Sequence, residues 1–536
     1  MHPISASFPI PKATLLVLLL ACALHFFLGA ALGLSVDEAH YALYALHPAW
    51  SYFDHPPLVG WVQWPLVALN APTWALRLLP ELLWLGTALM VFRLAERLAA
   101  LQSSQGAWSV GRSAQVKEEP AKRAGDTEQN ALPPTLLKPG QAGHWAVLAL
   151  TLAPLMHVLG IGLLPDTLLV FWTLALMDAT LTLRDPVAVR RPWPWLGLAV
   201  LLGLAGLSKY TAILGAVAVA LCLMQAHGLA LLRNRWLWLA MVVALVLVLP
   251  VAYWNHANQW VSFTYQAKHG AGGGWQGVHL LRFLLIQLLV YGPLLLWGLL
   301  GHLRNDTSVP RVLLLFFVVP FVVLAALSGG GTSLPHWTAP AWVALMPFAG
   351  LALARAWATG RRWLLGVLAV VQAGLTVAVL GLMLTGGVPF VTNTSGQGNS
   401  AAPSNPFADL HGWDKAGERA RSLAAQQGLG SVSVQNWTLA SRLGWYARPL
   451  PVHVLEDRFD QFDLWAGDLP AGGDTLLVDW SQLAYAVPLG ANGFATCTLL
   501  DTLDAQRLGR TLAVFRFYAC RGWSGQPHPR LQEATP

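Results

Sequence analysis

The sequence predicts an α-helical polytopic membrane protein with about eleven transmembrane helices and a C-terminal extracytoplasmic α/β domain. Charged residues make up only 11% of the 536 residues, whereas soluble globular proteins contain about 25%. Hydrophobic residues account for 55% of the chain, and the mean hydropathy is +0.51. Uncharged runs such as residues 241–250 recur throughout the first 385 residues. This composition excludes an ordinary soluble enzyme.

The apolar runs define a transmembrane domain over residues 1–385. A helix needs about 17–25 mostly apolar residues to cross a bilayer. The stretch 195–227 is too long for one crossing, so Ser208-Lys209-Tyr210 is interpreted as a tight turn between two short spans. The expected spans are residues 13–34, 74–98, 144–161, 165–183, 194–207, 211–228, 236–254, 279–300, 312–328, 338–357 and 363–385.

The basic residues orient these spans. Of the 22 Lys and Arg residues in 1–385, 18 fall on the side that carries the N-terminus. Because cytoplasmic loops carry the excess of Lys and Arg, we expect a cytoplasmic N-terminus and a periplasmic C-terminus in a bacterial inner membrane. The first span is expected to remain as an anchor, since its apolar core is longer than that of a signal peptide. The pI of 9.4 then reflects loops beside lipid headgroups, and no nucleic-acid partner is expected.

Three segments lie outside the spans. Residues 101–143 are rich in Lys, Glu, Pro, Gln and Ser, a composition typical of a disordered loop. Residues 386–408 form a Gly/Asn/Ser/Pro linker, and 409–536 form the α/β domain. In that domain we expect a helix at 409–427 and strands at 431–434, 475–480 and 512–518. Cys497 and Cys520 both fall there, which leaves a disulfide open.

Polar residues that are unusual for a membrane protein gather at span ends on the outer face. Ionisable groups within membrane segments are costly and are usually kept for function. With the orientation above, all of these segments face the same side. They are Asp37-Glu38 with His40-Tyr41, Tyr52 to Pro57, Pro165-Asp166, Ser208-Lys209-Tyr210, Trp254-Asn255 through Gly270, and Pro335-His336-Trp337.

Asp37 is the strongest candidate for a catalytic group. A carboxylate at the lipid interface can take a proton from an acceptor hydroxyl, or hold a divalent cation against a phosphate. Its neighbour Glu38 could serve the same chemistry, or could cap a short helix. Lys209 stands in an otherwise apolar stretch, where it could extend to the lipid surface or present its ammonium to a phosphate.

The other polar residues each have a structural alternative. Asp54 could be a turn residue and Asp166 a helix cap, or either could hold a ligand. His55 and His336 could be interface histidines, and Trp337 could belong to an aromatic belt. Carboxylates with a lysine at a membrane surface suit a lipid-linked phosphate as the leaving group. A nucleotide sugar is disfavoured, since no Rossmann-type fingerprint is present.

In combination, these segments resemble glycosyltransferase family 39 of the C superfamily, which contains relatives of protein O-mannosyltransferases and lipid A aminoarabinose transferases. The resemblance covers about residues 13–360 and is most specific at Tyr52 to Val59 and Ser208 to Thr211. It implies a helix bundle with a membrane-facing cavity and a polyprenyl-phosphate sugar donor. The implied reaction is an inverting transfer at the outer face.

The resemblance also implies roles for individual residues. The catalytic pair is Asp37 and Glu38, the donor phosphate is bound by Lys209, Tyr210 and His55, and a divalent cation would be held by Asp54 and Asp166. One departure is His336-Trp337-Thr338-Ala339-Pro340, where relatives usually read Asn-Trp-Pro-Ala-Pro. The remaining cavity positions are Tyr52, His40, Asn255, His336 and Trp337.

Two other classes of function compete with sugar transfer. A transporter or flippase of lipid-linked sugars would share the spans and the lipid partner, but it would place ionisable groups near the bilayer midplane and between related halves. A scaffold for the outer domain would leave Lys209 and Asp54 unexplained. The expected partners are the polyprenyl-phosphate sugar and membrane lipid, with the acceptor open among protein, lipid and glycan.

Overall fold

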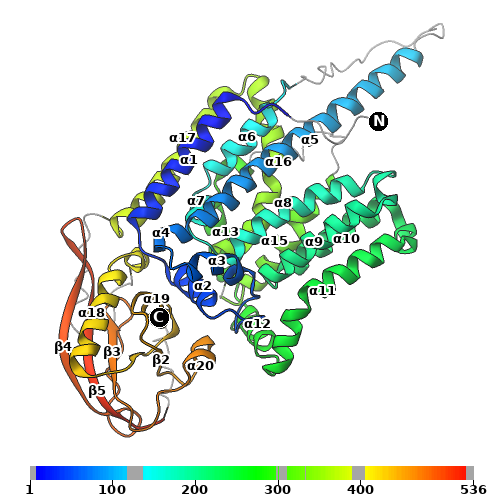
Figure 1. The fold of residues 1–536 in the computed structure, drawn as a ribbon. Helices are drawn as coiled ribbons and strands as arrows, with labels where there is room; N and C mark the ends of the chain where they lie inside the picture. Colours follow the sequence, from blue (N-terminus) through cyan, green and yellow to red (C-terminus); the bar gives the residue numbers. More distant parts are fainter. Residues whose placement is uncertain are drawn as a thin grey trace.

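The computed structural model describes residues 8–116, 137–296, 300, 311–331, 333–388 and 405–526. It consists of a helical bundle with a smaller α/β domain at one end (Figure 1). Within the described residues, eight helices are long and apolar enough to cross a membrane, or nine if one bent pair is counted as a span. The predicted fold class is confirmed, although the number of full-length apolar helices is smaller than eleven.

The bundle contains helices of three kinds. Those of membrane length are α1 (Lys12–Ala31), α4 with α5 (Thr73–Leu76, Leu78–Val116), α8 (Pro165–Leu183), α11 (Arg235–Ala257) and α17 (Arg362–Thr385). Three more reach membrane length together with an adjoining 3-10 turn: α10 (Ala212–His227) with Gly228–Arg233, α15 (Leu315–Ser328) with Arg311–Leu314, and α16 (Ala339–Ala358) with Pro335–Thr338. The shorter apolar helices are α3 (Leu58–Ala68), α9 (Pro192–Ser208) and α13 (Gly277–Tyr291). The bent pair is α6 (Gln141–Thr151) and α7 (Pro154–Ile161).

Each of the eleven predicted runs overlaps a described helix. Three of the runs do not correspond to a full-length straight helix among the described residues, and they account for the difference in number. Helices α9 and α13 contain 17 and 15 residues, which is at or below the lower limit for crossing a bilayer. Helices α6 and α7 meet at 78°. The bend occurs where Pro154 begins α7, because proline has no N–H to continue the ladder of the preceding helix.

The prediction that residues 101–143 form a disordered loop is wrong at both ends of this range. Helix α5 continues to Val116, and α6 begins at Gln141. No proline occurs between Pro80, in the first turn of α5, and Pro120, so the helix can extend beyond the apolar part of its sequence. The centre of the predicted loop, 117–136, lies outside the described residues. The polar segment after the first span is also helical, as α2 (Val36–Leu46).

The C-terminal domain contains a five-stranded sheet in the order β2-β1-β3-β5-β4. Strand β1 pairs in parallel with β2 and β3, while β5 is antiparallel to β3 and β4. The expected strands correspond to β1, β3 and β5, and β2 and β4 were missed. The elements are α18 (Trp413–Gln427), β1 (Val432–Val434), α19 (Trp437–Tyr446), β2 (Val452–Val454), α20 (Gln461–Trp465), β3 (Thr475–Trp480), β4 (Phe494–Arg507) and β5 (Arg510–Trp523).

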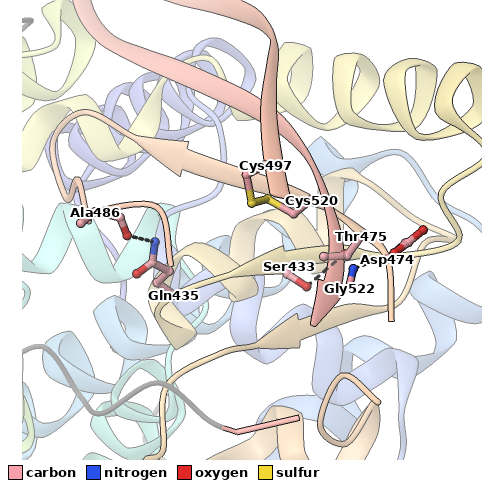
Figure 2. The surroundings of a disulfide bond; sticks show 8 residues. All are labelled: Ser433, Gln435, Asp474, Thr475, Ala486, Cys497, Cys520 and Gly522. Carbon is pink, nitrogen blue, oxygen red and sulfur yellow. Dashed lines mark hydrogen bonds between the residues drawn. A yellow bond between two sulfur atoms is a disulfide. The ribbon is translucent and has the colours of Figure 1, made fainter. Parts of the chain in front are cut away.

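A disulfide joins Cys497 and Cys520, which are directly opposite each other on β4 and β5. Figure 2 shows this bond beside the hydrogen bond between Ser433 and Thr475 of the neighbouring strands. The pairing that the sequence left open is therefore a cross-strand link within the long hairpin.

Helix α2 belongs to the hydrophobic core of the C-terminal domain. Its buried residues Ala39, Ala42 and Leu43 lie in the same cluster as Leu439 and Leu443 of α19. The polar segment that follows the first span is thus packed against a domain about 400 residues later in the chain. This packing fixes the position of the residues that α2 carries.

We predict that Leu443→Ala lowers the stability of the protein by about 2–5 kcal/mol, the usual cost of truncating a buried leucine. Leu443 is fully buried between α19 and α2. Thermal unfolding in detergent measures the effect. Leu508→Ala is the control, since Leu508 is 71% exposed, and equal melting temperatures for the two variants would contradict the shared core.

Candidate functional site

The six polar segments singled out in the sequence meet at the end of the bundle that faces the C-terminal domain. Ser51 Oγ lies 3.4 Å from Tyr210 Oη, and Asn255 Nδ2 donates to the same Tyr210 oxygen at 3.5 Å. Ser262 Oγ donates to the Tyr52 carbonyl at 2.9 Å. These contacts join the loop after α2, the turn between α9 and α10, and the segment that follows α11.

Glu38 serves the structure of α2 rather than the pocket. It forms a capping box with Ser35 at the start of the helix. Its Oε1 also accepts from Arg77 Nε at 2.8 Å, and Arg77 donates further to the carbonyls of Leu32 and Gly33. Both Glu38 and Arg77 are buried. The oxygens of Glu38 are thus occupied by an ion pair and a cap, which agrees with the capping alternative, and its catalytic role stays a prediction.

Asp37, one residue earlier, has a different environment. Burial raises the pKa of Asp37 above its usual value, and the nearby His336 and His40 partly oppose that rise. In the described part of the chain its carboxylate has no hydrogen-bonding partner. Asp37 is therefore the carboxylate that is left available to a ligand.

Asp54 is held as an anion by its neighbours. Its Oδ1 accepts a hydrogen bond from the Tyr44 hydroxyl and lies 3.7 Å from His40 Nε2. Its Oδ2 lies 3.9 Å from His55 Nε2. Burial alone would raise the pKa of Asp54, but the two histidines and the Tyr44 hydroxyl hold it below the usual range.

Lys209 and Asp166 form a buried ion pair. Lys209 Nζ lies 2.7 Å from both carboxylate oxygens of Asp166, and the two residues are only 6% and 1% exposed. Asp166 stands in the first turn of α8 after Pro165. His336 Nε2 lies 3.7 Å from the same carboxylate, and Lys209 lies 5.8 Å from the Trp337 ring. Asp166 thus positions the lysine that the sequence pointed to.

Two buried polar atoms near this pair have no partner among the described residues, His55 Nδ1 and Asn255 Oδ1. Burial lowers the pKa of His55 to about 4, with a further contribution from Lys209, so its imidazole is neutral at pH 7. The Tyr52 ring instead stacks on Tyr44 at 3.6 Å between centroids, which is a packing role. The site therefore offers neutral hydrogen-bonding groups beside one ammonium.

The residues do not fit a divalent cation. Both oxygens of Asp166 contact Lys209, and Asp54 is occupied by Tyr44 and two histidines. The described residues contain no group of three His, Cys, Asp or Glu side chains arranged for a metal. Divalent ions need several oxygen ligands, so the metal-binding prediction for Asp54 and Asp166 is not carried further.

Sequence reasoning missed the contribution of the C-terminal domain. Gln461 Oε1 accepts from the Phe53 backbone N–H at 2.8 Å, and Ser441 Oγ lies 3.0 Å from His40 Nδ1. The Asp409 carboxylate accepts from the Val36 N–H at 3.2 Å. The sequence carries no local signal for these three contacts, because the partners are about 400 residues apart.

Comparisons with known proteins agree with this architecture. Residues 136–254 match the family model described as dolichyl-phosphate-mannose-protein mannosyltransferase. The apo structure of ArnT from Cupriavidus metallidurans has a TM-score of 0.58 and 18% identity, covering 94% of this chain and 97% of that chain. ArnT from the same organism bound to undecaprenyl phosphate has a TM-score of 0.57 and 17% identity with the same coverage. No curated protein sequence matches the chain.

The structural likeness extends over both the helical bundle and the C-terminal domain, since it covers almost the whole of each chain. The family model independently matches the part of the chain that contains α6 to α11. The resemblance to glycosyltransferase family 39 is thereby confirmed, and the chain is an integral membrane protein whose fold is similar to that of ArnT.

Proposed function

We propose that this protein transfers a sugar, with inversion, from a polyprenyl-phosphate-linked donor to an acceptor at the outer face of a bacterial inner membrane. The observation that carries the proposal is the buried Lys209–Asp166 pair, which lies close enough to the available carboxylate Asp37 for Asp166 and Asp37 to interact electrostatically. A single displacement needs one group for the leaving phosphate and another for the attacking acceptor.

The phosphate would bind on the side of Lys209. The Lys209 ammonium has three N–H donors. Two of them donate to the two carboxylate oxygens of Asp166, so the third stays available for a phosphate. Neutral His55 and the Tyr210 hydroxyl add hydrogen bonds without adding charge. When the bond between the anomeric carbon and the phosphate oxygen breaks, its electron pair goes to the phosphate. The bound undecaprenyl phosphate in ArnT supports a ligand of this class.

The acceptor would bind on the side of Asp37. Because the pKa of Asp37 is raised by burial, this carboxylate is a stronger base than an exposed aspartate. It would orient the acceptor and take its proton during the attack. The charged groups lie at helix ends rather than at the middle of long helices, which argues against a transporter.

The direct test of this function is to incubate membranes that contain the protein with radiolabelled polyprenyl-phosphate sugars. We expect label to leave the lipid donor, and the fraction that gains it identifies the acceptor as protein, lipid or glycan. Donor that stays intact in every combination would contradict the proposal.

We predict that Asp37→Asn reduces the transfer rate at least about tenfold, in line with the usual contribution of a general base, without loss of expression. A general base works only when it is deprotonated, and the pKa of Asp37 is raised above the ordinary aspartate value of 3.8. As the pH is lowered, wild-type activity should therefore begin to fall before the pH reaches that ordinary value. The pH profile of kcat/KM measures both effects. Asp468→Asn, which removes an exposed carboxylate, is the control, and unchanged turnover in Asp37→Asn would refute the role of Asp37.

We predict that Lys209→Met weakens binding of undecaprenyl phosphate by roughly 100-fold, since removing one charged donor commonly costs about 2.7–4 kcal/mol. Asp166→Asn should weaken binding as well, because Lys209 would lose the carboxylate that positions it. Native mass spectrometry of the purified protein with undecaprenyl phosphate measures the affinity. Lys415→Met removes an exposed lysine and should leave binding unchanged, so equal losses in both lysine variants would argue against a specific site.

A further inference from the structure

Arg442 is a buried cation of the C-terminal domain to which the proposed function has given no role so far. It stands on α19 and is only 2% exposed. Its Cζ lies 4.1 Å and 5.0 Å from the ring centroids of Trp413 and Trp480, and its Nε donates to the Thr438 carbonyl at 3.1 Å. Burial lowers the pKa of Arg442 to about 9, so its guanidinium is charged at pH 7. A buried charge is costly unless it is paired, and its partner is the carboxylate of Asp409.

Asp409 connects this arginine with the first turn of α2. Its Oδ1 pairs with Arg442, and its Oδ2 accepts from the backbone N–H of Val36 at 3.2 Å. Val36 is the first residue of α2, and the first N–H groups of a helix have no partner within the helix. Asp409 therefore caps α2 from the C-terminal domain, at the residue that immediately precedes Asp37.

The pair also brings two opposite charges near the carboxylate of Asp37. Arg442 and Asp37 attract each other, and this attraction partly opposes the effect of burial on the pKa of Arg442. The Asp409 carboxylate contacts the residue next to Asp37 and repels its negative charge. A positive neighbour lowers the pKa of a carboxyl group and a negative neighbour raises it. The two members of the pair therefore act on Asp37 in opposite directions.

Other titratable groups act on Asp37 from the helical bundle and its loops. They are His336, His40, Asp54, Asp166 and Tyr41. The Arg442–Asp409 pair adds a contribution from the C-terminal domain, so a change in the pair alters the field at Asp37 while the bundle side of the site keeps its own residues.

We propose that Arg442 and Asp409 are positioning residues for Asp37, which fix the first turn of α2 and balance the charge beside the base. This inference rests on the proposed function and deepens it. Asp409 without Arg442 would place an uncompensated negative charge beside Asp37 and favour its protonated form. Arg442 without Asp409 would make Asp37 a weaker base. The active site is therefore complete only with the C-terminal domain in place.

The pH profile of kcat/KM for sugar transfer by the full-length protein tests this inference. The fall in activity at low pH is assigned to Asp37 by its loss in Asp37→Asn. We expect Arg442→Gln to move the fall to higher pH by about one unit, because Asp37 loses a positive neighbour and keeps a negative one. We expect Asp409→Asn to move the fall to lower pH by about one unit, because the opposite neighbour is lost.

Two further variants separate this effect from a loss of folding. Arg442→Lys keeps the positive charge and should keep the wild-type pH profile, although it should lower Tm because an ammonium lacks the planar group that stacks on the indole rings. The double variant Arg442→Gln with Asp409→Asn removes both charges, so its profile should return close to that of the wild type. Replacing both partners of a buried pair costs less stability than removing one, so the double variant also preserves the fold best.

Arg516→Gln is the matched control. Arg516 Nη1 pairs with Asp479 Oδ2 at 3.0 Å between β5 and β3 of the same domain, so this variant removes an arginine from an ion pair that does not involve Asp409. Its pH profile should equal that of the wild type. At the pH optimum we expect Arg442→Gln and Asp409→Asn to lower kcat about tenfold, as a misplaced catalytic group does. The KM for the lipid-linked donor should change little, since Lys209 is untouched.

The outcomes that would count against this inference are distinguishable from a failure of the proposed function. A wild type that transfers sugar, while Arg442→Gln and Asp409→Asn leave the fall at low pH in place or move it in the same direction, would overturn the inference alone. A fall that persists in Asp37→Asn would also overturn it, because the titrating group would then be a different one. A wild-type protein that transfers no sugar from any lipid-linked donor would overturn the proposed function, and this inference with it.

Discussion

The constraint on which the site depends is the cost of burying charge beside a membrane. Lys209 is nearly inaccessible to water, and its ammonium is tolerated because both oxygens of Asp166 contact it. Breaking a buried ion pair by removing one partner typically costs about 3–5 kcal/mol. The pair therefore holds the start of α8 against the end of α9, and it brings His336 at the start of α16 to the same place. This arrangement places Lys209, Asp166 and His336 together, where the phosphate is proposed to bind.

Three carboxylates stand close together in the site and a fourth, that of Glu38, lies beside it, and their surroundings give each a different role. Asp166 is neutralised by a lysine, Glu38 by Arg77, and Asp54 is kept ionised by histidines and a tyrosine hydroxyl. Asp37 alone has no hydrogen bond or ion pair among the described residues; burial raises its pKa, while His336, His40 and the buried Arg442 act on it electrostatically from farther away. Carboxylates whose environments push their pKa values apart commonly divide the tasks of base and electrostatic support. The chemistry of the site thus comes from the partners of the carboxylates.

The C-terminal domain takes part in building this pocket. It shares a hydrophobic core with α2, and it contacts the backbone around Asp37 at successive positions. Leu410 accepts from the Gly33 N–H, Tyr446 Oη from the Leu34 N–H, and Asp409 from the Val36 N–H. A short helix at a membrane surface has little stability of its own, so the domain supplies the packing that keeps Asp37 and His40 in register with the loop that carries Asp54.

The sequence by itself determined the membrane class, the location of the apolar helices other than α3, three strands and the segments that meet in the site, because hydropathy and periodicity are local properties of the chain. It left open whether Glu38 is catalytic or a helix cap, and it did not assign Asp166 to Lys209 or connect Ser441 with His40. Those roles depend on which side chains become neighbours after folding, across separations of up to about 400 residues. An acidic residue is written the same way in the sequence whether its carboxylate pairs with an arginine, with a lysine or with no charged group. Only the tertiary structure decides which of these partners it has.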